Sequence, residues 1–423
     1  MSFPRYEHYK DSGVEWLGEV PAHWDVAPLK QVISKIESGT SVNAIDTPAS
    51  GDELGVLKTS CVYRGEFDPS ENKAIVAEEY DRAACPVTAG TLIVSRMNTP
   101  DLVGAAGVVN KTEENLFLPD RLWQVHFRGA NPSFVHFWCN TNSYRAQVEM
   151  ACAGASSSMQ NLAQDQFRSF VLPKPTLVEQ DQIAAFLTRE TAKLDALITE
   201  QRTLIDLLKE KRQAVISHAV TKGLDPDVAM KDSGVEWLGE VPAHWEIVRL
   251  KRAVVLQRGH DLPSEERQEG EIPIVSSGGI TGWHHQAQAK GPGIVTGRYG
   301  TIGQFTFVED DYWPLNTTLY SVDLFDNVPR FIWYMLQNIS VLFLMNSGKS
   351  AVPGVDRNDL HPVPVVVPPV IEQNGIVDFL AIEIARLDAL TAEAETTIAL
   401  LQERRSALIS AAVTGKIDVR QAA

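Results

Sequence analysis

The stretch from Lys10 to Trp24 reads KDSGVEWLGEVPAHW, and residues 231–245 repeat it letter for letter. A repeated block decides how the rest of a chain is divided, because each copy marks one module. The two copies lie 221 residues apart, which is far too long a period for a solenoid. The sequence therefore predicts one domain-sized module that is used twice.

A second pair of related segments completes each module. Residues 178–201 read VEQDQIAAFLTRETAKLDALITEQ, and residues 371–394 read IEQNGIVDFLAIEIARLDALTAEA, 193 residues later. The stretches between the repeated blocks differ in sequence, and each is large enough for one domain. The predicted boundaries are a first domain with its repeated segment at 1–176, a helix at 177–222, a linker with the second repeated segment and domain at 223–369, a second helix at 370–415 and a tail at 416–423.

The later repeated segments show leucines at heptad spacing, which is the pattern of a coiled-coil seam. Each predicts a helix of about 40 residues, hence roughly 60 Å long. We expect the two helices to pair antiparallel, since such a pair relates tandem copies by a pseudo-two-fold axis. The alternative is that each helix folds back on its own domain. The predicted seam residues are Leu187, Leu194, Leu197, Leu204, Leu208 and Val215 in the first helix, and Leu380, Leu387, Leu401 and Leu408 in the second.

The stretches between the repeated blocks are predicted to form short strands and turns. TLIVSR (91–96) matches GIVTGR (293–298), and LWQVHF (122–127) matches LYSVDLF (319–325). These matches indicate that both domains share one fold. The predicted class is α+β: two similar mixed α/β domains in tandem, separated by two long helices that form an antiparallel coiled coil with pseudo-two-fold symmetry.

The composition indicates the cellular compartment of the protein and limits the kinds of partner that it can bind. The chain carries 54 acidic and 38 basic residues, so its net charge is −16. This charge argues against a protein that binds phosphate groups through an overall positive charge alone. The N-terminal sequence MSFPRYEHYK has no apolar core of a signal peptide, and no apolar run is long enough to span a membrane. We therefore expect a cytoplasmic protein with no membrane contact.

Two short segments resemble motifs of catalytic or phosphate-binding sites, but neither matches its motif fully. Asn131-Pro-Ser-Phe134 lacks the second proline of the N-P-P-F/Y motif of amino-methyltransferases, and no cofactor loop precedes it. Ser347-Gly-Lys-Ser350 resembles the end of a phosphate loop, but Phe343 stands where that loop requires glycine. We expect the chain itself to be no enzyme and to bind no metal or cofactor.

The two G-V-E-W-L-G-x-V-P-x-H-W segments, with the P-x-x-x-E-Q-x-x-I-x-x-F-L entry to each helix, resemble the DNA-specificity (S) subunit of type I restriction–modification systems. The entries lie at 175–187 and 368–380, so the resemblance covers nearly the whole chain. It implies that each variable region is a target-recognition domain for one half of a split double-stranded DNA site. The helices would hold the halves apart and dock two modification (methyltransferase) subunits.

The resemblance also implies further partners in a bacterial cytoplasm. The modification subunits would carry S-adenosylmethionine, and restriction/translocase subunits would use ATP and Mg²⁺. The alternative is a scaffold without DNA specificity, in which two ligand- or protein-binding domains share a coiled coil. DNA readout requires polar side chains on loops that reach the base edges. The candidate DNA-contacting residues are Arg96, Asn98, Ser157, Ser158, Gln160, Arg298, Tyr299, Lys349 and Ser350.

Overall fold

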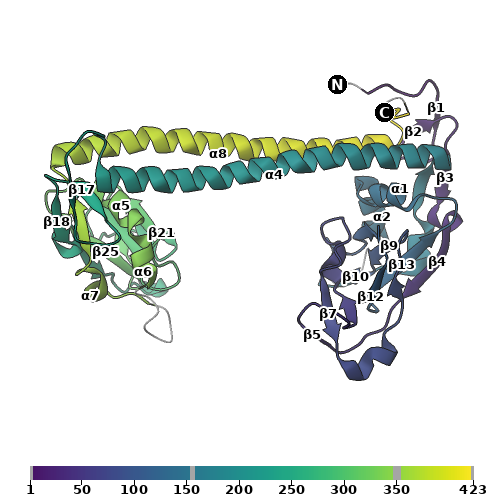
Figure 1. The fold of residues 1–423 in the computed structure, drawn as a ribbon, viewed down its shortest axis with the longest axis horizontal. Helices are drawn as coiled ribbons and strands as arrows, with labels where there is room; N and C mark the ends of the chain where they lie inside the picture. The colour runs from purple at the N-terminus through teal and green to yellow at the C-terminus, as the bar shows by residue number, and fades with distance from the viewer. Residues whose placement is uncertain (1–2, 153–157, 346–353, 421–423) are drawn as a thin grey trace. The chain divides into compact units, whose positions relative to one another are not determined.

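The computed structural model describes residues 3–152, 158–345 and 354–420. The chain forms two compact units, one made of residues 1–200 with 397–423 and the other of residues 201–396. Two long helices contribute a part to each unit, α4 (Leu177–Lys222) and α8 (Val370–Val413) (Figure 1). Over the described ranges, no helix is both long and apolar enough to cross a membrane.

The first unit is built on an antiparallel sheet with the strand order β11-β9-β13-β4. Its strands are β4 (Ile33–Ser38), β9 (Leu92–Ser95), β11 (Ala106–Val108) and β13 (Leu122–Phe127). Alternate side chains of β9 enter different cores, as the two-residue period of a strand requires. Leu92 and Val94 lie in the main core with the helices, and Ile93 lies in a smaller core behind the sheet.

A second sheet covers that smaller core, with the order β5-β7-β6-β12-β8. Its strands are β5 (Ala44–Ile45), β6 (Gly55–Leu57), β7 (Asn72–Ile75), β8 (Pro86–Val87) and β12 (Glu113–Phe117). Only β6 and β12 run parallel among the pairs of this sheet in the described residues.

The second unit repeats this plan. Its main sheet has the equivalent order β23-β22-β25-β19, and its smaller sheet, β21-β20-β24, keeps the parallel pair as β20 and β24. The strands are β19 (Val255–Arg258), β20 (Ile272–Ser276), β21 (Gly279–His284), β22 (Gly293–Gly297), β23 (Phe305–Val308), β24 (Trp313–Pro314) and β25 (Thr318–Asp323). The prediction of two similar mixed domains in tandem is confirmed.

Short elements frame the main sheet of each unit, and the second unit repeats most of those of the first. In the first unit they are β1 (Tyr9–Asp11), β2 (Glu19–Pro21), β3 (Asp25–Pro28), α1 (Pro132–Cys139), α2 (Asn142–Cys152), β10 (Met97–Asn98), β14 (Gln160–Asn161), α3 (Gln164–Ser169) and β15 (Val171–Lys174). In the second they are β16 (Met230–Asp232), β17 (Glu240–Pro242), β18 (Glu246–Arg249), α5 (Pro329–Asn338), α6 (Ser340–Met345), α7 (Arg357–Leu360) and β26 (Pro364–Val367).

The two long helices pack against each other antiparallel, as predicted. In the first unit Arg405 of α8 donates from Nε to Asp195 of α4 at 2.9 Å. In the second unit the equivalent pair has exchanged helices: Arg212 of α4 donates to Asp388 of α8 at 2.6 Å. Each partner lies 193 residues from its equivalent, so both units pair the helices through the same two positions of the repeat. The ends of both helices also enter the domain cores, so the helices are not folded back on separate domains.

The seam between the two helices consists of two rows of buried or half-buried residues, and the second row of α4 differs from the prediction. Leu187, Leu194, Leu208, Leu380 and Leu387 are buried, and Val215, Leu401 and Leu408 are half-buried, as expected. Leu197 and Leu204, however, are 44% and 42% exposed. The companion row instead lies four residues after each position of the heptad row 187, 194, 201, 208 and 215, and consists of Thr191, Ile198, Ile205, Arg212 and Ala219. Positions three and four residues onward both flank a helical row, so the leucine pattern alone chose the wrong flank.

Candidate nucleic-acid interface

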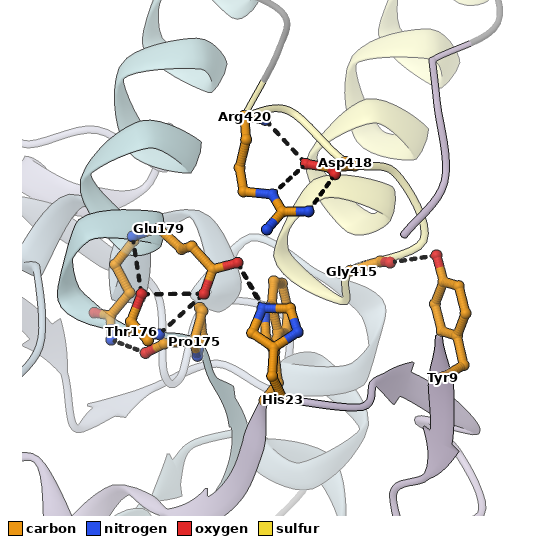
Figure 2. Close-up of polar contacts among 10 residues, drawn as sticks. Tyr9, His23, Pro175, Thr176, Glu179, Gly415, Asp418 and Arg420 are labelled. Carbon is orange, nitrogen blue, oxygen red and sulfur yellow. Dashed lines mark hydrogen bonds and ion pairs between the residues drawn. The ribbon is translucent and has the colours of Figure 1, made fainter. Parts of the chain in front are cut away.

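A buried carboxylate joins the repeated segments in the first unit. Glu179, in the first turn of α4, accepts hydrogen bonds from His23 Nε2 at 2.8 Å and from Trp24 Nε1 at 3.4 Å (Figure 2). Its second oxygen accepts from the hydroxyl of Thr176 at 3.0 Å, and the Glu179 N–H donates back to that hydroxyl. Burial raises the pKa of Glu179, but the hydrogen bonds from His23, Trp24 and Thr176 outweigh it and leave the pKa below its ordinary value.

The second unit repeats this contact with equivalent residues. Glu372 accepts from His244 at 2.6 Å and from Trp245 at 2.8 Å. Both tryptophans are fully buried. The repeated His-Trp and Glu-Gln pairs therefore meet in space, and together they attach each domain to the start of its long helix.

The glutamine that follows each glutamate fixes a second part of the domain. Gln180 accepts the backbone N–H of Asn131 at 2.8 Å and donates to the Pro175 carbonyl at 2.9 Å. Gln373 accepts the N–H of Val328 at 2.7 Å and donates to the Pro368 carbonyl at 2.9 Å. Asn131 and Val328 are the N-caps of α1 and α5, so the long helices hold the domain helices at matched positions.

The N-terminal segment and the C-terminal tail meet beside this contact (Figure 2). The hydroxyl of Tyr9 donates to the Gly415 carbonyl at 3.0 Å, and the Asp418 N–H donates to the Pro4 carbonyl at 2.8 Å. Arg420 forms a two-point contact with Asp418, and its guanidinium lies 4.8 Å from the ring centroid of Tyr6. The hydrogen bond from Arg420 holds the pKa of Asp418 below its ordinary value.

The predicted DNA-contacting arginines occupy equivalent positions. Ser95 pairs with Leu122 and Gly297 pairs with Thr318, so Arg96 and Arg298 each follow the same strand by one residue. Arg96 is half-buried, and its guanidinium lies 5.9 Å from the Trp123 ring centroid. Arg298 donates to the Asn316 carbonyl at 3.3 Å and lies 5.0 Å from the ring centroid of Tyr299.

The other predicted DNA-contacting residues lie in different surroundings. Asn98 is buried, and its amide donates to the hydroxyls of Tyr63 and Ser95, which favours a structural role. Gln160 is half-buried and pairs with Asn98 across β10 and β14. Ser158 and Tyr299 are exposed. Ser157, Lys349 and Ser350 lie outside the described residues.

A polar groove beside Arg298 contains residues that the sequence reasoning missed. Its volume is about 680 Å³, and Arg258, Arg298 and Arg357 reach it from the end of β19, the end of β22 and the start of α7. The side chains of Arg258 and Arg357 form no ion pair within the described parts of the chain. The carboxylates in the groove are engaged: Asp356 caps α7 through the Asn358 N–H, and Asp261 accepts from Asn316. The groove can therefore offer guanidinium groups to an anionic or acceptor-rich ligand.

The corresponding positions of the first unit are neutral. Ser38 pairs with Trp123 as Arg258 pairs with Leu319, and Gln164 opens α3 as Arg357 opens α7. Arg258 and Arg357 lie in unmatched stretches of sequence, so no pattern in the chain relates them to Arg298. The two domains thus present different side chains on one framework.

Comparison with known proteins shows what this framework resembles. The family model described as the type I restriction modification DNA specificity domain matches residues 242–399. The putative type I restriction enzyme MjaX specificity subunit of Methanocaldococcus jannaschii is 20% identical over 449 residues, covering 99% of each chain. Residues 242–399 thus match the type I DNA specificity domain, and the chain resembles type I specificity subunits over nearly its whole length.

Two further comparisons show a similarity to the same group of proteins. The type I restriction enzyme EcoEI specificity subunit of Escherichia coli is 25% identical over 160 residues, which are 37% of this chain and 27% of that protein. A solved structure described as the basis of complex assembly and conformational transition of the type I R-M system has a TM-score of 0.73 at 16% identity, covering 93% of this chain and 98% of that one.

The repeat in the sequence corresponds to two parts of this framework. The identical segments and helix entries form the attachment described above, and the unmatched stretches form the domains. No cluster of histidine, cysteine or acidic residues suited to hold a metal occurs among the residues that the structure describes.

Proposed function

We propose that the chain reads an asymmetric, bipartite double-stranded DNA site, one half with each domain, with an unread gap between the halves. The observation that carries this proposal is the pair of equivalent domains with different polar surfaces. Arg258 and Arg357 line the groove of the second unit, whereas Ser38 and Gln164 stand at the equivalent positions of the first unit. One framework with two sets of polar side chains suits two different half-sites.

The groove in the second unit fits nucleic-acid chemistry. A guanidinium group can donate two parallel hydrogen bonds to O6 and N7 of guanine in the major groove, or to a phosphate. Arg298 is positioned by Asn316 and Tyr299, whereas Arg258 and Arg357 are exposed and available. We assign base or phosphate contact to these three arginines, and the equivalent contact in the first unit to Arg96.

The paired helices serve as the scaffold in this proposal. Leu197 and Leu390 are equivalent positions on the outer faces of α4 and α8, and both are more than 40% exposed. Equivalent apolar positions on both helices suit two copies of one partner. We assign that role to two modification subunits, which supply S-adenosylmethionine and perform the methyl transfer in the bacterial cytoplasm.

Catalysis lies entirely outside this chain in the proposed complex. Restriction/translocase subunits join through the modification subunits and use ATP and Mg²⁺. The specificity subunit contributes binding, orientation and the spacing of the half-sites.

Methylome sequencing tests the proposal directly. A strain that expresses the chain with its modification subunit should gain methylation at one asymmetric bipartite motif. Arg258→Ala and Arg357→Ala should relax or abolish recognition of one half-site only, since each good bidentate contact contributes about 1–3 kcal/mol of discrimination. Arg252→Ala, an exposed arginine that does not line the groove, is the matched control.

The outcome that contradicts the proposal is equally concrete. If the reconstituted complex methylates or binds duplexes without sequence preference, the chain is a scaffold without DNA specificity. If the groove variants alter both half-sites equally, the assignment of one half-site to each domain is wrong.

A further inference from the structure

The repeated segment is identical at positions that the fold does not explain. Leu17, Val20 and Trp24 are buried, and so are Leu238, Val241 and Trp245, so packing accounts for their identity. The identity ends abruptly after each tryptophan: β3 reads DVAP, whereas the equivalent β18 reads EIVR. The fold therefore tolerates change at neighbouring positions of the same framework.

Turn geometry accounts for a second group of identical residues. In the first copy the Gly13 N–H donates to the Asp11 carboxylate at 2.9 Å, and Gly13 and Gly18 have positive φ angles of 71° and 67°. The second copy repeats that bond between Gly234 and Asp232, and Gly234 and Gly239 have similar φ angles of 66° and 62°. Glycine adopts such angles without strain, so these identities follow from the backbone.

Three exposed side chains have neither explanation. Glu15, Trp16 and Glu19 are exposed, and so are their equivalents Glu236, Trp237 and Glu240. Trp16 is 40% exposed and Trp237 is 38% exposed. None of these six side chains has a hydrogen bond or ion pair to any described residue. A contact outside the chain would account for a large indole at the surface in both copies.

The loop presents this indole on a rigid base. Leu17 is buried directly after Trp16, and the Ser12 N–H donates to the Gly18 carbonyl at 3.0 Å across the loop. The same bond joins Ser233 and Gly239 at 3.0 Å. A side chain held by a preformed loop loses little conformational entropy when it is buried at an interface.

We propose that the loops Gly13–Gly18 and Gly234–Gly239 are two equivalent docking points, one for each modification subunit. The indole of Trp16 or Trp237 inserts into an apolar pocket on the modification subunit, and basic groups around that pocket face the two glutamates. This assignment rests on the proposed function, which supplies a partner present twice. Two identical surfaces on one chain match two copies of one partner, whereas the two different grooves match two different half-sites.

Residue type, and the two carboxylates that both loops share, favour a protein over DNA as the occupant. Each loop presents two carboxylates beside the tryptophan, and phosphates repel such a surface. Tryptophan is also enriched among the residues that dominate protein–protein binding energy. The loops are therefore protein-docking surfaces and not a further part of the DNA interface.

The test is the stoichiometry of the complex. The chain and its cognate modification subunit are mixed near the dissociation constant and measured by native mass spectrometry. Trp16→Ala and Trp237→Ala should each weaken one of the two sites by about 30-fold or more, leaving one subunit bound, and the double variant should bind neither at that concentration. Trp283→Ala is the matched control, because Trp283 is 57% exposed but lies outside the repeated segment. It should leave two subunits bound.

Thermal unfolding of each variant should match the unsubstituted chain, since the replaced rings are exposed. The docking assignment would be overturned if the double variant still bound two modification subunits with unchanged affinity. It would also be overturned if the variants lost self-association of the chain but kept the binding of modification subunits. Failure of the proposed function appears differently: the unsubstituted complex forms with two modification subunits but shows no DNA sequence preference.

Discussion

At the scale of single residues, Glu179 and Glu372 account for why two distant segments are repeated together. Each carboxylate accepts from the histidine and the tryptophan of its repeated segment, so a change in either segment disrupts the other. The sequence showed both repeats but not their contact, because the partners are more than 120 residues apart along the chain.

Removal of the Glu179 carboxylate should destabilise the first unit. Glu179→Ala leaves the Trp24 N–H buried without a partner, and we expect a loss of about 1–3 kcal/mol in the free energy of unfolding. Urea denaturation followed by tryptophan fluorescence measures this loss. Glu200→Ala, which removes an exposed carboxylate from the same helix, should stay within about 0.5 kcal/mol. Equal losses in the two variants would contradict the role of Glu179.

The lowered pKa of Glu179 also predicts a pH dependence. A carboxylate with a lowered pKa in the folded state contributes stability that is present above its ordinary value of 4.5 and is lost as the pH falls through the folded value. The unsubstituted chain should therefore lose stability more steeply below pH 4.5 than Glu179→Gln, which cannot titrate at this position. Urea denaturation at several pH values compares the two slopes, and identical slopes would show that Glu179 contributes nothing to them.

At the scale of elements, the heptad pattern of the long helices predicted the correct spacing of the buried residues but the wrong second row. The leucine row was confirmed at Leu187, Leu194 and Leu208, but its flank is formed by Ile198 and Ile205 and not by Leu197 and Leu204. Because Leu197 and Leu204 are exposed, they are available for contacts outside the helix pair.

Adjacent residues of α4 give a matched test of this correction. Ile198 is 5% exposed, so Ile198→Ala should cost about 2–5 kcal/mol in the free energy of unfolding of the isolated chain. Leu197→Ala should change it by no more than about 0.5 kcal/mol. Chemical denaturation of both variants distinguishes the two flanks, and a reversed order would restore the predicted seam.

At the scale of the whole molecule, the net charge of −16 bears on the proposed DNA binding. The arginines of the second groove are local exceptions in an acidic chain, so we expect most phosphate contacts to come from partner subunits. The isolated chain should bind duplex DNA weakly with a shallow salt dependence, and the complex with modification subunits should show a steep one. Each phosphate contact contributes about −0.9 to the slope of log K against log salt.

Fluorescence anisotropy across a salt series measures both slopes. A mixed-sequence duplex without the recognition site serves as the control for non-specific binding. If the isolated chain gives a slope as steep as that of the complex, its own basic residues make the phosphate contacts and the charge argument is wrong.

The sequence by itself determined the duplication, the α+β class and the pair of long helices, because identical segments and heptad leucines are local patterns that one chain displays directly. The tertiary structure alone decided which flank of the leucine row is buried, since residues three and four positions onward are equally near in a helix. It also brought Arg258, Arg298 and Arg357 to one groove from three elements. Such convergence depends on strand register and loop path, which no spacing along the sequence records.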